Sequence, residues 1–280
     1  MNKTPTPPAM LTSPRWHLDD IDWSRIGRSI ADDPRWFYLL AIASMIETGS
    51  DLYARNLGAY YSADPEASAW MTRAWQAEEV QHGAALRRYV ETVWPDFDWP
   101  EAYRRFFAEY SLTATVEEFR PTPGLELAAR CSVETGTSAY YRMLYELAPE
   151  PQLRRILDNI RSDEVRHYKN FLHFFRRHQR SEHQSRWAVA RALASRLLET
   201  RSGDGWIAFR HVFEVRQPGR RCTPADYRAF VLTVRDLAAR AFPYRMATEM
   251  LLAPLELPAR LRAALRWCIE ATLRRKAFNP

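Results

Sequence analysis

A duplicated segment constrains the fold of this 280-residue chain more than any other feature of its sequence. Residues 47–57 resemble residues 134–144, and both stretches begin with Glu-Thr-Gly. Each copy is followed by a second shared block, which reads Glu-Glu-Val-Gln-His at 78–82 and Asp-Glu-Val-Arg-His at 163–167. The chain therefore reads as two related helical hairpins. In each hairpin the first helix carries a glutamate and the second carries a Glu-x-x-His motif.

Four glutamates and two histidines in this order are the ligand set of a dinuclear metal site in a four-helix bundle. The Glu and His of each motif share one helix face, and mostly apolar or small residues surround them. Buried carboxylates without a counter-charge would be very costly, whereas two divalent cations would neutralise four of them. Mixed Glu/His ligation without sulfur favours iron, with manganese as the alternative, over structural zinc. The candidate metal ligands are Glu47, Glu79, His82, Glu134, Glu164 and His167.

An acidic residue directly precedes the glutamate of each Glu-x-x-His motif. Metal-bound histidines usually donate their second ring N–H to a carboxylate. With pseudo-twofold packing of the two hairpins, Asp163 would hold His82 and Glu78 would hold His167. These two acids are therefore candidate supporting residues of the metal site.

Glycines and tyrosines beside the ligands leave alternatives open. The Thr-Gly pairs at 48–49 and 135–136 fit either close helix packing or room for dioxygen or substrate. Tyr53, Tyr140 and Tyr141 are expected to be core or hydrogen-bonding residues rather than radical sites.

Helix signals run along most of the chain and predict an all-α fold. Glycine occurs only 9 times, and Asp-Pro and Thr-Pro pairs provide capping residues followed by proline at the first helical position. The connection between the two hairpins is long, as in ferritin-like bundles with one crossover. The expected helices cover 34–61, 65–94, 101–111, the stretch from the break at 121–124 to 147, the stretch from the break at 149–151 to 180, and then 187–200, 205–215, 224–241 and 257–276.

The domain organisation follows from these elements. Residues 1–32 are expected to form an N-terminal tail and lead-in, and residues 33–180 the four-helix bundle. Residues 181–280 would add C-terminal helices that pack on the bundle within a single domain. This last part shows no ligand set, and it could also form a subunit interface.

Composition bears on location and partners. No run of about 18 or more apolar residues is present, so we expect no membrane span. Residues 1–14 are rich in Pro and Thr and lack the apolar core of a secretory signal, which predicts a flexible tail. Three scattered cysteines predict neither a disulfide framework nor a zinc site, so a cytoplasmic location is expected. The net charge of +6 reflects either genomic base composition or an acidic partner.

Two blocks of the sequence resemble those of a known enzyme family. Residues 72–83 read Thr-Arg-Ala-Trp-Gln-Ala-Glu-Glu-Val-Gln-His-Gly and resemble the second-ligand block of soluble acyl-carrier-protein desaturases. The Asp-Glu-Val-Arg-His block at 163–167 is similar to that family's Asp-Glu-x-Arg-His block. These desaturases belong to the ferritin-like di-iron carboxylate proteins, and the resemblance covers residues 35–180. The chain departs from the plant-type pattern at Val80 and Gln81, where that pattern has Asn-Arg.

The resemblance also implies roles for the candidate residues. Glu79 and Glu164 would bridge two iron ions, and Glu47 and Glu134 would be terminal ligands. The two histidines would complete the two metal positions. Thr137 matches the place where the family has a threonine near the oxygen-binding face, which makes it the candidate catalytic residue.

The implied function is that of an oxygen-dependent, non-haem di-iron oxidoreductase acting on an aliphatic substrate. An acyl-carrier-protein desaturase with a ferredoxin-like electron donor agrees best with the resemblance. The alternatives are a di-iron hydroxylase or N-oxygenase of a small specialised metabolite, and a ferroxidase or iron-binding protein. A nucleic-acid-linked hydroxylase would need a continuous basic surface, which the short basic runs at 220–221 and 274–276 do not predict. Homodimers are common in such families.

Overall fold

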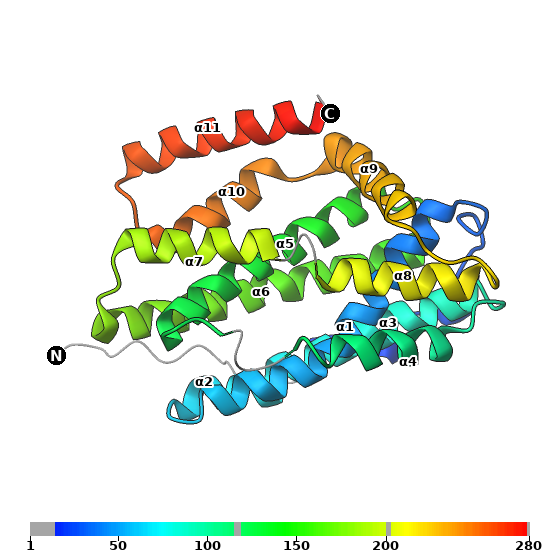
Figure 1. Ribbon diagram of the computed structural model, residues 1–280, viewed down its shortest axis with the longest axis horizontal. Coiled ribbons are helices and arrows are strands. Elements are labelled where there is room, and N and C mark those ends of the chain that lie inside the picture. The colour runs from blue at the N-terminus through cyan, green and yellow to red at the C-terminus, as the bar shows by residue number, and fades with distance from the viewer. Residues whose placement is uncertain (1–14, 115–118, 200–202, 279–280) are drawn as a thin grey trace.

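Helices make up all the regular structure of the described residues. The computed structural model describes residues 15–114, 119–199 and 203–278, and it contains no strand within these ranges. Figure 1 shows long helices lying side by side, with the C-terminal helices covering one side of them. The prediction of an all-α, ferritin-like four-helix bundle with added helices is confirmed. The flexible tail predicted for residues 1–14 lies outside the described residues.

Four long helical stretches form the bundle. The first is α1 (Pro34–Tyr60), and the second is composed of α2 (Pro65–Trp70), a π-helical segment (Met71–Trp75) and α3 (Gln76–Val93). The other two are α5 (Pro123–Leu147) and α6 (Pro151–Glu182). Short connections pair α1 with α3 and α5 with α6, and α3 also contacts α6. The two duplicated hairpins therefore face each other.

The bundle helices begin where the capping signals predict. The side chains of Asp33, Asp64 and Thr122 each accept a hydrogen bond from a backbone N–H of the first turn. Glu150 does the same at α6, where it accepts from two backbone N–H groups. A proline follows each of these residues at the first helical position. Its lack of an N–H costs no hydrogen bond there, because the first N–H groups of a helix have no partner within the helix.

The sequence predicts one uninterrupted helix over residues 65–94, whereas the structure has a π-helical segment within this stretch. The π-helical segment directly precedes α3, which carries the first Glu-x-x-His motif. The wider turn buries Met71, Ala74 and Trp75 against the bundle core. Such π segments are rare and often lie at functional sites. They have no simple sequence marker, which is why periodicity alone predicts a regular helix here.

The crossover and the C-terminal helices enclose the bundle. The crossover contains α4 (Trp99–Tyr110), which packs against α8 (Asp204–Arg216). Contacts with α5 are made by α7 (Arg186–Glu199) and α10 (Tyr244–Leu252), whereas α8 also contacts α1. The outermost layer in Figure 1 consists of α9 (Pro224–Ala241) and α11 (Ala259–Phe278). The sequence pattern does not predict α10, because Pro243 and Pro254 interrupt it on either side of this helix.

The segment before α1 is part of the core rather than a simple lead-in. Two short 3-10 turns at Leu18–Asp20 and Trp23–Arg25 are followed by the start of α1. Trp16, Ile21 and Ile30 are all buried. The segment therefore covers one side of the bundle, at the level of the predicted metal ligands.

Candidate metal centre

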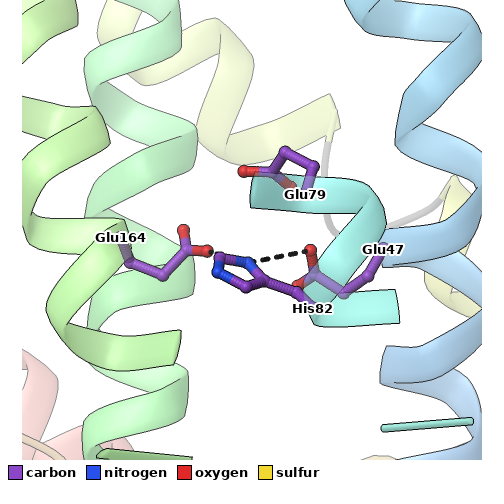
Figure 2. Close-up of side chains that lie close together, drawn as sticks. All are labelled: Glu47, Glu79, His82 and Glu164. Carbon is purple, nitrogen blue, oxygen red and sulfur yellow. Dashed lines mark ion pairs between the residues drawn. The ribbon is translucent and has the colours of Figure 1, made fainter. Parts of the chain in front are cut away.

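The six predicted ligands lie together at the centre of the bundle. They form two overlapping groups: Glu47, Glu79, His82 and Glu164 in one, and Glu79, Glu134, Glu164 and His167 in the other. Within each group one potential ligand atom per residue lies within 4.8 Å of every other. Figure 2 shows the first group, whose side chains point toward one another from α1, α3 and α6. Glu79 and Glu164 belong to both groups and so lie between the two half-sites.

These side chains are removed from solvent. Their exposed fractions range from 0% for His82 to 6% for Glu79. Six ionisable groups in one buried cluster are unusual, because charged side chains are seldom fully buried without a partner. The cluster therefore requires a source of positive charge.

Four atoms aimed into the cluster make no hydrogen bond. They are His82 Nδ1, His167 Nδ1, Glu134 Oε2 and Glu164 Oε1. His82 Nδ1 lies 3.2 Å from Glu164 Oε1, and His167 Nδ1 lies 3.0 Å from Glu79 Oε1. Buried polar atoms are normally paired, so four unpaired atoms at one place indicate a missing ligand. Imidazole nitrogens and carboxylate oxygens are the atom types that bind iron or manganese.

The outer nitrogen of each imidazole contacts the acid expected from the sequence. His82 Nε2 lies 3.0 Å from Asp163 Oδ2, and His167 Nε2 lies 2.7 Å from Glu78 Oε2. The structure therefore has both contacts between hairpins that the sequence predicts, while the role of the two acids in supporting a metal site stays a prediction. When Nε2–H donates to the carboxylate, the lone pair of Nδ1 is directed into the cluster. This is the tautomer that metal binding through Nδ1 requires.

Two further residues hold these acids in place, and the sequence analysis missed both. Arg166 donates to Glu78 Oε1 at 2.5 Å and lies 2.7 Å from Asp163 Oδ1, so one guanidinium joins the two acids. The indole N–H of Trp16 donates to Asp163 Oδ2 at 2.8 Å. Arg166 lies within the second Glu-x-x-His motif, three residues after Asp163, and this spacing was an available signal. Nothing in the sequence links Trp16 to a residue so distant along the chain.

The two terminal carboxylates have different outer partners. The Tyr141 hydroxyl donates to Glu47 Oε1, in agreement with the hydrogen-bonding role expected for this tyrosine. Arg130 Nη2 donates to Glu134 Oε1 at 2.7 Å, one helical turn before Glu134 on α5. Arg130 was not among the predicted site residues, although its spacing places it on the same face as Glu134.

Thr137 also reaches the cluster. Its hydroxyl donates to Glu164 Oε2 at 2.5 Å, which leaves Oε1 of the same carboxylate for the centre. The residue is partly buried. Its assignment as a catalytic residue stays a prediction.

Burial dominates the protonation of the carboxyls when no metal is present. Burial, with the charges of Glu79 and Glu164 nearby, raises the pKa of Glu47 well above its usual range. Burial likewise raises the pKa of Glu134 to about 8, although Arg130 opposes the change. Burial disfavours a charged His82, but the hydrogen bond to Asp163 and the negative charges of the nearby Glu164 and Glu79 outweigh it and raise the imidazole pKa well above its usual range. Protons thus provide the compensating positive charge in the absence of metal.

The formal charges of the cluster match two divalent cations. The six carboxylates are those of the four glutamate ligands, Glu78 and Asp163, and the two guanidiniums are those of Arg130 and Arg166. With neutral imidazoles the difference is four negative charges. Two divalent ions would neutralise these charges without any proton.

The glycines beside the ligands fall into two classes. A Cβ atom at Gly83 would lie 2.7 Å from the backbone nitrogen of Thr48, so α1 and α3 approach closely there. A Cβ at Gly49 would meet Phe106 and Tyr110 at 3.2 Å. A Cβ at Gly136 would meet no atom within 4 Å. Close packing therefore explains Gly83 and Gly49, whereas Gly136 faces open space.

Solved structures share the fold of this chain. Two variants of an R2-like ligand-binding oxidase with an aerobically reconstituted Mn/Fe cofactor match at 15% sequence identity. The TM-scores are 0.53 and 0.55, and each match covers 94% of this chain and 89% or 88% of the other. At this identity the likeness establishes the fold. No protein-family model and no curated protein matches the sequence.

Proposed function

We propose that this protein is an oxygen-dependent, non-haem oxidoreductase whose centre holds two iron ions, or one manganese and one iron. The observation that carries the proposal is the set of four unpaired ligand atoms inside a buried cluster whose carboxylates exceed its guanidiniums by four formal negative charges. The Mn/Fe cofactor of the two structurally similar oxidases supports this choice of metals. The absence of sulfur among the ligands supports it as well.

Each ligand has a role that its position supports. Glu79 and Glu164 would bridge the two ions because both belong to both groups. Glu47 and His82 would complete one position, and Glu134 and His167 the other. When bound, a pair of redox-active ions supplies the electrons that activate dioxygen.

The protein's own contribution is to orient the ligands and exclude water. Asp163 and Glu78 accept the Nε2–H of the two imidazoles and so fix their tautomers. Tyr141 and Thr137 each donate to one oxygen of a carboxylate, so that the second oxygen of Glu47 and of Glu164 would be the one to bind metal. Burial of all six ligands keeps bulk water away from the reacting centre.

For the substrate we propose an aliphatic chain, most simply an acyl group on an acidic carrier protein. The desaturase-like blocks around α3 and α6 support this, as does an Arg-rich chain with net charge +6. A ferredoxin-like protein would supply electrons. Hydroxylation or N-oxygenation of a small metabolite uses the same centre and is the alternative, and a ferroxidase is the second alternative.

Metal analysis followed by an oxygen pulse tests the proposal. The protein would be loaded anaerobically with Fe²⁺ or with Mn²⁺ and Fe²⁺, and bound metal and dioxygen uptake would be measured. We expect two ions per chain and stoichiometric oxygen uptake, with both lost in Glu79→Ala and Glu164→Ala. Glu91→Ala is the control, because Glu91 lies on α3 and, among the residues that the structure describes, its one ion pair is with the half-exposed Arg87. A wild-type protein that binds no more metal than Glu79→Ala would refute the proposal.

A second experiment distinguishes the proposed oxidoreductase from the ferroxidase alternative. A ferroxidase takes up dioxygen with Fe²⁺ alone and continues to do so as Fe²⁺ is added, and a storage protein accumulates many irons per chain. The proposed enzyme would stop after its two ions are oxidised and would need an electron donor to continue. Continued turnover with excess Fe²⁺ would favour the ferroxidase.

A further inference from the structure

The two halves of the centre differ at the terminal carboxylates of Glu47 and Glu134, although the helices that carry them are duplicated. The imidazole sides of the half-sites match, because each histidine contacts an acid that is bound to Arg166. The carboxylate sides do not match. Glu47 accepts from a neutral phenol, whereas Glu134 is paired with a cation.

The sequence shows where this difference arises. One turn before each glutamate, the first copy has Ala43 and the second has Arg130. Two turns after each glutamate, the first copy has Ala54 and the second has Tyr141. Both differences between the copies lie in α5, and each affects one half of the centre. Arg130 donates to Glu134 on its own helix, and Tyr141 donates to Glu47 on α1.

Arg130 is held firmly beside Glu134. Its guanidinium lies over the rings of Tyr53, Trp75 and Phe171, at 4.9, 5.0 and 5.3 Å from their centroids. Only 8% of the residue is exposed, so water screens its charge weakly. Within the described part of the chain, Glu134 is the one carboxylate that forms an ion pair with it.

We propose that Arg130 makes the two metal positions unequal, so that the position of Glu134 and His167 binds its ion more weakly and fills second. This inference rests on the proposed function. The guanidinium withdraws negative charge from Glu134 and repels a nearby cation, whereas the Tyr141 hydroxyl adds no net charge at Glu47. The first ion therefore occupies the position of Glu47 and His82. Arg130 acts on the centre through Glu134 and is a positioning residue.

The test compares two substitutions that differ in charge. Arg130→Gln keeps a hydrogen-bond donor for Glu134 without the charge, and Arg130→Lys keeps the charge. Metal-free protein would be titrated anaerobically with Mn²⁺, and free Mn²⁺ would be followed by its electron paramagnetic resonance signal. Mutual repulsion between two bound ions also separates the two dissociation constants, so the comparison between variants decides.

In Arg130→Gln we expect the second dissociation constant to fall about tenfold to hundredfold, the range that a charged hydrogen bond is worth. The first constant would change little, and Arg130→Lys would keep the wild-type gap. Tyr141→Phe is the matched control on the other half-site and would change the first constant instead. Circular dichroism would confirm that each variant folds.

Different failures have different meanings. A second constant that is unchanged or higher in Arg130→Gln overturns the role of Arg130 while two bound ions still support the dinuclear centre. Failure of the wild type to bind Mn²⁺, Fe²⁺ or both together overturns the centre and this inference with it. Crystals grown with one equivalent of Mn²⁺ provide an independent check, since anomalous density at Glu134 and His167 would contradict the filling order.

Discussion

Substitution of Gly83 by alanine tests the close approach of α1 and α3 beside the centre. Gly83 follows His82, and the residue it faces, Thr48, follows Glu47. An alanine Cβ would lie 2.7 Å from the Thr48 nitrogen and 2.9 Å from its Cα. Carbon contacts are normally about 3.5–4.0 Å long, so the two helices must separate by roughly 0.6–1 Å at this point.

The cost can be estimated from opposing terms. Overpacking of this kind costs about 1–3 kcal/mol, and replacing a helical glycine by alanine returns about 1 kcal/mol. The free energy of unfolding should therefore fall by about 0–2 kcal/mol, which lowers Tm by up to roughly 8 °C for a chain of this size. Because the displaced backbone carries Glu47 and His82, metal affinity should fall as well.

Gly136→Ala is the matched control. Gly136 also lies in a bundle helix beside a ligand, but a Cβ there meets no atom within 4 Å. The same substitution should therefore stabilise the protein by about 1 kcal/mol through helix propensity alone. Thermal unfolding of the metal-free proteins by circular dichroism measures both changes. If Gly83→Ala were as stable as Gly136→Ala, the close contact between α1 and α3 would be wrong.

Three other predictions concern the cluster and its supports. Because burial raises the pKa of Glu134 to about 8, its carboxyl is protonated at pH 7 without metal. Metal binding should therefore release protons, and metal affinity should increase as pH rises toward 8. Binding heats that are the same in buffers of different ionisation enthalpy would contradict this. The contribution of Glu134 to the stability of the metal-free fold is fully present below the usual pKa of 4.5 and is lost as pH rises through about 8. Urea midpoints of the metal-free protein should therefore fall over that pH range, and a rise would refute the reasoning. Asp163→Ala removes the partner of His82 and should weaken metal binding about 10- to 100-fold, whereas unchanged metal content would show that Asp163 does not orient the imidazole.

The cluster of candidate ligands could be predicted from the sequence because the relevant signal is local and occurs twice. A Glu-x-x-His motif on one helix face needs no tertiary information, and its repetition makes coincidence a poor explanation. The acids at 78 and 163 could be assigned to opposite histidines by assuming twofold packing, and the structure has those contacts. Helix starts were equally local, since Asp33 and Asp64 cap the helices that follow them.

The residues that the sequence does not predict make contacts that arise from tertiary packing, or lie where the two copies of the repeat differ. Trp16 donates to a residue in α6, and no periodicity connects the two. The sequence predicts a core or hydrogen-bonding role for Tyr141, but its partner Glu47 lies on another helix. Arg130 could have been found, because Ala43 occupies the equivalent place in the first copy.

The position of metal in crystals of the reconstituted protein tests the central claim most directly. Data collected at the absorption edges of iron and manganese should show two anomalous peaks per chain within the described cluster. One peak should lie next to His82 Nδ1 and the other next to His167 Nδ1, with Glu79 and Glu164 between them. A single peak, peaks outside the bundle, or ligation through the Nε2 atoms that contact Asp163 and Glu78 would contradict the account.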